Sequence, residues 1–234
     1  MVRDAIDRIR ENAAPGPDDM TNKILIELKS EISYPLSILF RKSLDAMKIP
    51  NEWRLSNVTP IYKLKGSKSD PGNYRPVSLT SNVCKLMERV VNVELSDHLE
   101  KRVLGNTQHG FRRGRSCQTN LIEFLDKVTC WLDEGNCVDV LYVDFRKAFD
   151  KVDHDRLMVK LKAEGVDGKL WGWLKDWLSE RYQRVVVNGK VSKWVLVVSG
   201  VPQGTVLGGP LFTVYVKDIN EWIRAFLRKF ADDT

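Results

Sequence analysis

The chain has 234 residues, of which 43% are apolar and 29% charged, and its formal net charge is +6. This composition excludes a disordered chain and provides enough apolar material for one domain or two lobes. No stretch approaches the roughly 18 consecutive apolar residues of a membrane span, and the N-terminus lacks the apolar core of a signal peptide. We therefore expect an intracellular protein, nuclear or cytoplasmic, that is not secreted and has no transmembrane segment.

The positive charge is confined to one segment. Residues 63–115 contain 11 Lys and Arg against 5 Asp and Glu, whereas the rest of the chain carries 26 of each sign. Such a segment is either a solvated face or a surface that binds polyphosphate, and charge alone does not decide between them.

The four cysteines indicate neither a disulfide framework nor a zinc site. Cys84, Cys117, Cys130 and Cys137 form no CxxC pair and have no histidine at zinc-ligand spacing. We expect reduced thiols, most of them buried, with structural roles for Cys130 and Cys137.

The first part of the chain is expected to be mostly helical. One helix ends near residue 12, and two amphipathic helices follow over 21–50, with a break near Pro35. Alternation over 58–62 predicts a short strand, and the prolines and glycine of 66–76 predict a loop.

The central part combines two long helices with one buried strand. Apolar residues recur at helical spacing over 81–102 and 117–134, and Gly135 supplies a C-terminal stop. The segment CVDVLYVDF, residues 137–145, is apolar at nearly every position, which predicts a central strand covered on both faces.

The last part continues with helices over 153–164 and 168–180, and we expect the tryptophans of the second to pack in the core. Asn188-Gly189 between two β-rich runs predicts a hairpin. A helix over 210–227 and a strand beginning at 229–231 complete the order. The fold class is therefore α+β, with a mostly antiparallel sheet and two lobes.

Carboxylates stand at the ends of two predicted strands. Asp144 ends the buried strand, and Asp232 and Asp233 follow the last one. A buried carboxylate is costly unless it is paired or binds a metal, and Mg²⁺ prefers such oxygen ligands. Two neighbouring strands could therefore deliver ligands for two ions that assist phosphoryl transfer. The alternative is a simple turn at 232–233 and a helix cap at Asp144.

Two segments near these carboxylates could line a pocket. Phe149 lies within DFRKAF just after Asp144, and Gln203 lies in the loop SGVPQGTVLG. A glycine-rich loop leaves its backbone close to a ligand, and glutamine offers both a donor and an acceptor. Phe149 could equally be a core residue.

The sequence contains five blocks in this order: DPGNYRPVSLTS, QHGFRRGRSCQTNL, VDVLYVDFRKAFDKVDH, SGVPQGTVLG and FADDT. Together they resemble reverse transcriptases of non-LTR retrotransposons, the LINE-like elements of the jockey and chicken-repeat type. The resemblance runs from about residue 14 to the end. It implies a right-hand polymerase with an N-terminal helical extension (1–56), fingers (57–136) and a partial palm (137–234) truncated at the catalytic hairpin, without a thumb.

The resemblance also implies the roles of the carboxylates and their neighbours. Asp144 and Asp232 would be the main ligands of two Mg²⁺ ions, or Mn²⁺, with Asp233 beside them. Phe149 would be a steric gate that excludes the 2′-hydroxyl of a ribonucleotide, and Gln203 would help to position the incoming nucleotide.

The basic segment would contact phosphates. Arg75 would hold the triphosphate together with Lys63 or Lys65, because a guanidinium matches phosphate oxygens. The template path would be lined by Arg112, Arg113 and Arg115. His109 is expected to make local hydrogen bonds and not to act in catalysis.

Three departures separate this sequence from the family pattern. Asp19 replaces a glycine in PGPDD, LGGPLF places Gly209 before the helix-starting proline, and the chain ends at Thr234, within the catalytic hairpin. We expect a polymerase fragment that binds an RNA template, a DNA primer and dNTPs but is inactive as an isolated chain. The alternative is a relic that binds nucleic acid without catalysis. A two-metal nuclease is a weaker third possibility because no His-Asp constellation supports it.

Overall fold

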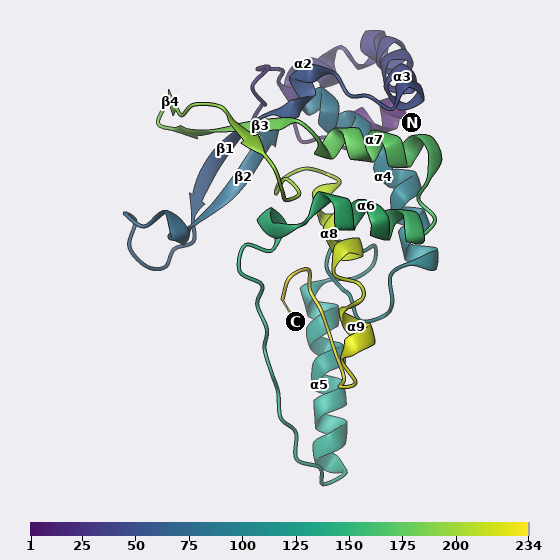
Figure 1. The fold of residues 1–234 in the computed structure, drawn as a ribbon, viewed down its shortest axis with the longest axis vertical. Coiled ribbons are helices and arrows are strands. Elements are labelled where there is room, and N and C mark those ends of the chain that lie inside the picture. Colours follow the sequence, from purple (N-terminus) through teal and green to yellow (C-terminus); the bar gives the residue numbers. More distant parts are fainter. Residues whose placement is uncertain (234) are drawn as a thin grey trace.

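The computed structural model describes residues 1–233, apart from the side chain of Trp222. Helices pack together on one side of a small sheet, while one long helix and the segment after it extend away from this body (Figure 1). The helices are α1 (Val2–Asp7), α2 (Asn22–Glu27), α3 (Lys29–Ala46), α4 (Asn82–Arg102), α5 (Cys117–Asp133), α6 (His154–Ala163), α7 (Gly168–Leu178), α8 (Gly208–Tyr215) and α9 (Ile219–Trp222). The strands are β1 (Leu55–Tyr62), β2 (Tyr74–Thr80), β3 (Arg181–Val187), β4 (Lys190–Val191) and β5 (Val195–Val197). Short 3₁₀ turns lie at Asn51–Arg54, Pro71–Asn73 and Phe149–Lys151.

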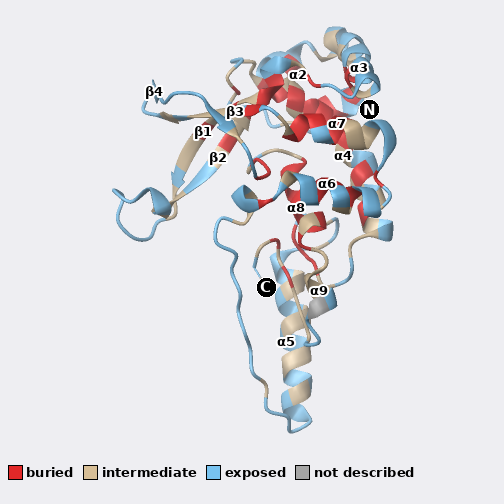
Figure 2. Cartoon of the chain, viewed as in Figure 1, coloured by how far each residue is buried: buried red, intermediate tan, exposed pale blue. Residues whose placement is uncertain are grey.

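The core lies between α4, α6, α7 and α8. Figure 2 shows buried residues concentrated on these helices and absent along α5. Trp173 and Trp177 of α7 are buried in this core together with Leu157 and Phe212, which confirms that the tryptophans of this helix are packing residues. None of the helices in the described part of the chain is long and apolar enough to cross a membrane.

The sheet is mixed, in the order β2-β1-β3-β4, with β5 also paired to β3. β1 and β3 run parallel, and the other pairs are antiparallel. The α+β class is therefore confirmed. Because β1 and β3 pair, the sheet crosses the predicted boundary between residues 136 and 137, and the division into fingers and palm stays a prediction.

The sequence did not predict β2, because its prolines and polar residues resemble a loop. Pro76 lies directly opposite Pro60 of β1. The amide of Lys63 donates to the carbonyl of Asn73, so alternate pairs along this ladder are hydrogen-bonded and the proline pair is not. The two prolines therefore cost the ladder no hydrogen bond.

The hairpin predicted at Asn188-Gly189 is confirmed. These residues have φ angles of 50° and 74° and connect the paired residues Val187 and Lys190. Positive φ at both central positions belongs to the tight turn that matches the twist of its strands, which explains the choice of asparagine and glycine.

The prediction of a buried central strand over 137–145 is wrong. Residues 137–143 form no regular structure, and Leu141 is 83% exposed. In Figure 1 the segment runs back from the far end of α5, and the ring of Tyr142 lies 6.4 Å from that of Phe124 on this helix. A strand needs a neighbour for its amides and carbonyls, and among residues 1–233 the only ladder contact here is one bridge at Asp144.

Two helix boundaries also differ from the predictions. The break in the N-terminal helices lies at Leu28, and Pro35 sits inside α3. Pro35 is exposed, so water can satisfy the carbonyl that the proline leaves without a partner. The first helix also ends earlier than expected, at Asp7.

The helix predicted over 210–227 is interrupted after Tyr215. The ammonium of Lys160 donates to the carbonyl of Tyr215 and pairs with Asp218 at 2.6 Å. This lysine from α6 supplies a donor to a carbonyl at the C-terminal end of α8 and thereby favours the end of the helix there.

The expectation that most cysteines are buried is wrong. Only Cys84, on α4, is buried, whereas Cys117, Cys130 and Cys137 are exposed free thiols. The exposed three lie on α5 or just after it, and α5 buries none of its residues.

Candidate active site

The two groups of predicted metal ligands meet in the structure. Asp144 and Asp233 form an antiparallel bridge. The amides of Phe230 and Asp233 donate to each other's carbonyl oxygens at 2.8 and 3.1 Å, which closes a tight turn with Asp232 inside it. Ala231, at the first central position, has a φ angle of 58°. Backbone pairing therefore brings together carboxylates from two segments that are far apart in the sequence.

The charges of Asp144, Asp233 and Arg75 act on Asp232. Partial burial raises the pKa of Asp232, the negative charges of Asp233 and Asp144 raise it further, and the positive charge of Arg75 opposes them. Within residues 1–233, no three side chains of His, Cys, Asp or Glu are grouped closely enough to hold one metal ion. The structure thus brings the acidic residues together within reach of the positive charge of Arg75.

The predicted triphosphate ligands lie along the β1-β2 ribbon. Arg75 is exposed on β2, opposite Ile61. The ammonium of Lys63 donates to the carbonyl of Gly72, whereas Lys65 is exposed in the loop that follows. Of these three predicted ligands, only Lys63 is held by a local contact among the described residues.

The loop that carries Gln203 is fixed against two of these elements. The carbonyl of Gln203 accepts a hydrogen bond of 2.8 Å from the Ser78 amide of β2. The amide of Val201 donates to the carbonyl of Phe149 at 2.9 Å. Gly204 has a φ angle of 105°, and a side chain there would approach the Ser78 carbonyl oxygen to 3.1 Å. Gln203 thereby lies beside both the strand of Arg75 and the segment of Phe149.

Glu88 on α4 is a buried anchor of this loop that the sequence analysis missed. It is 0% exposed, and its carboxylate accepts hydrogen bonds from the amides of Val206 and Leu207 at 2.8 and 3.2 Å. Burial raises the pKa of Glu88, while these two bonds oppose the shift. The available signal was a single glutamate among apolar positions on the buried face of a predicted helix.

Phe149 belongs to an aromatic stack. Its ring stacks on Phe212 of α8 at 4.6 Å and meets the edge of Phe111 at 5.9 Å. A side chain at Gly209 would come within 2.3 Å of the Phe111 ring, so the extra glycine of LGGPLF makes room for this residue. The stack supports the packing role of Phe149, and its role as a steric gate stays a prediction.

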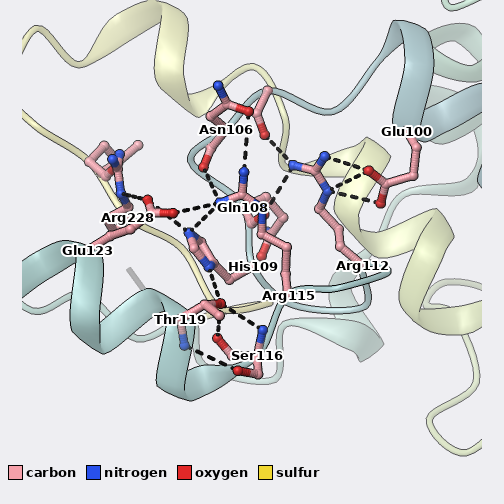
Figure 3. Close-up of polar contacts among 12 residues, drawn as sticks. Glu100, Asn106, Gln108, His109, Arg112, Arg115, Ser116, Thr119, Glu123 and Arg228 are labelled. Carbon is pink, nitrogen blue, oxygen red and sulfur yellow. Dashed lines mark hydrogen bonds and ion pairs between the residues drawn. The ribbon is translucent and has the colours of Figure 1, made fainter.

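Two of the three predicted template arginines are held in ion pairs within the chain (Figure 3). Arg112 makes a bidentate pair with Glu100, at 3.0 Å from Nε and 2.6 Å from Nη2. Arg115 donates to Glu123 at 2.9 Å and to Asn106. Arg113 is exposed.

The side chain of His109 makes local contacts, as predicted, whereas its amide donates to the distant carbonyl of Lys229. Its fully buried ring lies 2.9 Å from the hydroxyl of Thr119 and 3.1 Å from the Arg115 guanidinium (Figure 3). Burial lowers the pKa of His109. Glu123 also pairs with Arg228 at 2.9 Å, so this cluster joins the QHGF segment to α5 and to the chain before Phe230.

A cavity of about 640 Å³ between α1 and α4 adds three cations that the sequence analysis did not select, Arg8, Arg89 and Lys101. Arg8 and Arg89 line it together with Arg113. Within the described residues, the buried Nε of Arg89 has no hydrogen-bond partner. Asp4, Asp97 and Glu100 also line the cavity, so it carries side chains of both charges.

Comparison with known proteins shows one consistent relationship. Residues 65–234 match the family described as reverse transcriptase (RNA-dependent DNA polymerase). The chain is 30% identical, over 99% of its length, to the probable RNA-directed DNA polymerase from transposon BS of Drosophila melanogaster. Identity is 29% over 99% to the enzyme of its X-element and 28% over 93% to that of its mobile element jockey. The chain spans about a quarter of the length of these relatives (26%, 26% and 24%).

Proposed function

Because the chain belongs to the reverse transcriptase family, we propose that it forms the part of a non-LTR retrotransposon polymerase that binds template, primer end and incoming dNTP. The bridge between Asp144 and Asp233 is the observation that carries this proposal, because it joins the two acidic motifs into one site. The substrates would be an RNA template and a DNA primer.

Asp144, Asp232 and Asp233 are the proposed ligands of divalent ions, which the family uses. Their donors suit Mg²⁺, or Mn²⁺, because hard cations prefer carboxylate oxygens. When bound, two such ions would stabilise negative charge on the attacking and leaving oxygens of nucleotidyl transfer. Partial burial raises the pKa of Asp232, and the negative charges of Asp233 and Asp144 raise it further; a cation would relieve the repulsion between these charges.

Arg75 is the proposed triphosphate ligand, with Lys63 or Lys65 as its partner. Support comes from its position on β2, where its charge reaches Asp232 and the neighbouring Ser78 holds Gln203. A guanidinium binds phosphate oxygens in pairs, so Arg75 would orient the triphosphate toward the carboxylates. Gln203 would contact the nucleotide, and Phe149, next to this loop, would exclude a 2′-hydroxyl.

Arg113 is the proposed direct contact to template phosphates in the QHGFRRGRS segment. Arg112 and Arg115 are engaged with Glu100 and Glu123, so they would fix the loop and add positive charge to the template path. An ion-paired arginine contributes less to counterion release than an unpaired one. Replacement of Arg113 should therefore weaken template binding more than replacement of Arg115.

Primer extension tests the polymerase proposal. The 234-residue chain is incubated with an RNA template, a labelled DNA primer, dNTPs and Mg²⁺, in parallel with an Asp144→Asn variant that keeps the shape and removes the charge. Extension by the unmodified chain and its loss in the variant would establish catalysis. Extension that persists in the variant would refute the assignment of Asp144.

A second function, binding of nucleic acid without catalysis, is favoured by one observation. Within residues 1–233, no three side chains of His, Cys, Asp or Glu are grouped closely enough to hold one metal ion. In this case the chain would bind a primer-template duplex with an affinity that falls steeply between low and moderate salt, yet extend no primer. Fluorescence anisotropy at 50 and 200 mM salt measures the binding, and an affinity independent of salt would contradict both functions.

A further inference from the structure

The QHGF segment pairs directly with the chain that leads into the acidic turn. The amide of Lys229 donates to the carbonyl of Thr107 at 2.7 Å, and the amide of His109 donates to the carbonyl of Lys229 at 2.8 Å. Gln108 and Lys229 form a parallel bridge between these two bonds. The register of the two segments is thus fixed immediately before Phe230.

The side chain of Gln108 continues this pairing where the backbone ladder stops. Its Oε1 accepts the amide of Ala231 at 2.9 Å, and its Nε2 donates to the carbonyl of the same residue at 3.4 Å. Oε1 also accepts the amide of Gly110 at 2.7 Å. Gln108 is 3% exposed, so water does not compete for these contacts. The carboxamide of Gln108 therefore supplies Ala231 with the acceptor and the donor that a neighbouring strand would otherwise provide.

Ala231 is the residue that needs such support. Its φ angle of 58° is unfavourable for an L-residue with a Cβ, and it directly precedes Asp232. Gly110 leaves the space that Ala231 occupies, because a side chain there would come within 2.3 Å of the Ala231 nitrogen. A change in the backbone at Ala231 would redirect the carboxylate that follows.

We propose that Gln108 is a positioning residue that holds Ala231 through its carboxamide and thereby sets the direction of Asp232 and Asp233. This inference rests on the proposed function of the two carboxylates. Only a side chain with an acceptor and a donor at this length satisfies both groups of Ala231. Glutamate keeps the acceptor and loses the donor, whereas methionine keeps the length and loses both.

Amide hydrogen exchange measured by NMR on the 234-residue chain tests the contact. In Gln108→Met we expect protection of the Ala231 and Gly110 amides to fall at least tenfold. The amides of Val206 and Leu207, which Glu88 binds, report on the rest of the site and should change less than twofold. In Gln108→Glu both bonds to the acceptor remain, and protection at Ala231 should stay within threefold of the original.

A second measurement tests positioning. Binding of Mn²⁺, followed by electron paramagnetic resonance, should weaken about tenfold in Gln108→Met, while the control Glu94→Gln, on the exposed side of α4, should leave it unchanged. A purely structural glutamine would not move this affinity once the fold is intact. If the unmodified chain binds no Mn²⁺, the metal assignment fails, but the exchange data still decide whether Gln108 holds Ala231.

Three results would overturn the inference. Unchanged protection of Ala231 in a folded Gln108→Met would show that the carboxamide does not hold this residue. If Gln108→Met fails to fold, Gln108→Glu decides, because a loss of protection at Ala231 with protected Val206 and Leu207 would contradict the acceptor contact. Lost protection with full Mn²⁺ affinity would show a contact that does not position the carboxylates.

Discussion

Replacement of Glu88 tests whether the Gln203 loop depends on one buried carboxylate. Glu88→Ala leaves the half-buried amide of Val206 and the buried amide of Leu207 without an acceptor. Each unpartnered amide costs about 1–3 kcal/mol, and the loss is partly offset because a buried charge is also removed. We expect the free energy of unfolding to fall by about 3 kcal/mol.

Glu88→Gln separates the acceptor from the charge. The glutamine carbonyl can accept both amides, and no charge is buried, so we expect a change within about 1 kcal/mol. Urea denaturation followed by the fluorescence of the buried Trp173 and Trp177 measures both variants. Glu94→Gln, on the exposed side of the same helix, is the control and should change the stability by less than about 0.5 kcal/mol.

The pH dependence gives this prediction its sign. Burial raises the pKa of Glu88 in the folded protein. The contribution of protonated Glu88 to the free energy of unfolding is therefore fully present below the unfolded pKa and is lost as the pH rises through the folded pKa. Cys84, Lys85 and Arg89 on α4 and Arg181 on β3 are the charged or titratable neighbours. The stability of the original chain relative to Glu88→Gln should therefore decrease from pH 4 to pH 7. A glutamine variant as unstable as the alanine variant, with a difference independent of pH, would refute the reasoning.

Three further changes test other parts of the chain. Asp19→Gly should raise the free energy of unfolding by about 0.5–1 kcal/mol, and Asp19→Ala should not, because residue 19 is exposed with a φ angle of 53°; thermal denaturation measures both. Asp176→Ala should cost about 3–5 kcal/mol in urea denaturation, because it leaves the buried guanidinium of Arg54 without its carboxylate, and a loss below about 1 kcal/mol would contradict this. Burial lowers the pKa of Lys229 to about 8. As the pH rises from about 8 to the unfolded lysine pKa near 10.4, the original chain should therefore become more stable relative to Lys229→Met. Equal slopes of unfolding free energy against pH for the two chains over this range would count against a buried ammonium.

Features governed by neighbours in sequence were predictable. Ser81 accepts the amide of Cys84 at the start of α4, and Gly135 and Gly165 end two helices with φ angles of 81°. Asn188-Gly189 specified its hairpin in the same way. These signals act within one turn of the chain, so periodicity and capping residues are sufficient to read them.

Features governed by distant partners were not predictable. The pairing of Pro76 with Pro60 depends on the phase of the β1 ladder, and composition alone made β2 look like a loop. The exposed state of 137–143 depends on which strands lie nearby, which an apolar run does not reveal. Within the candidate site, the order of motifs selected the carboxylates and Gln203 as candidates, but the ion pairs of Arg112 and Arg115 depend on acidic residues of two different helices.

The unpaired segment 137–143 has a consequence for the behaviour of the chain in solution. Its backbone groups are not used in a ladder within residues 1–233, and Val140, Leu141, Tyr142 and Val143 are exposed together. A run of β-forming residues with one charge and no proline is a template for strand addition between molecules. Concentrated solutions should therefore self-associate through this segment, and Leu141→Lys, a charge placed on an 83% exposed position, should raise solubility with little effect on the fold.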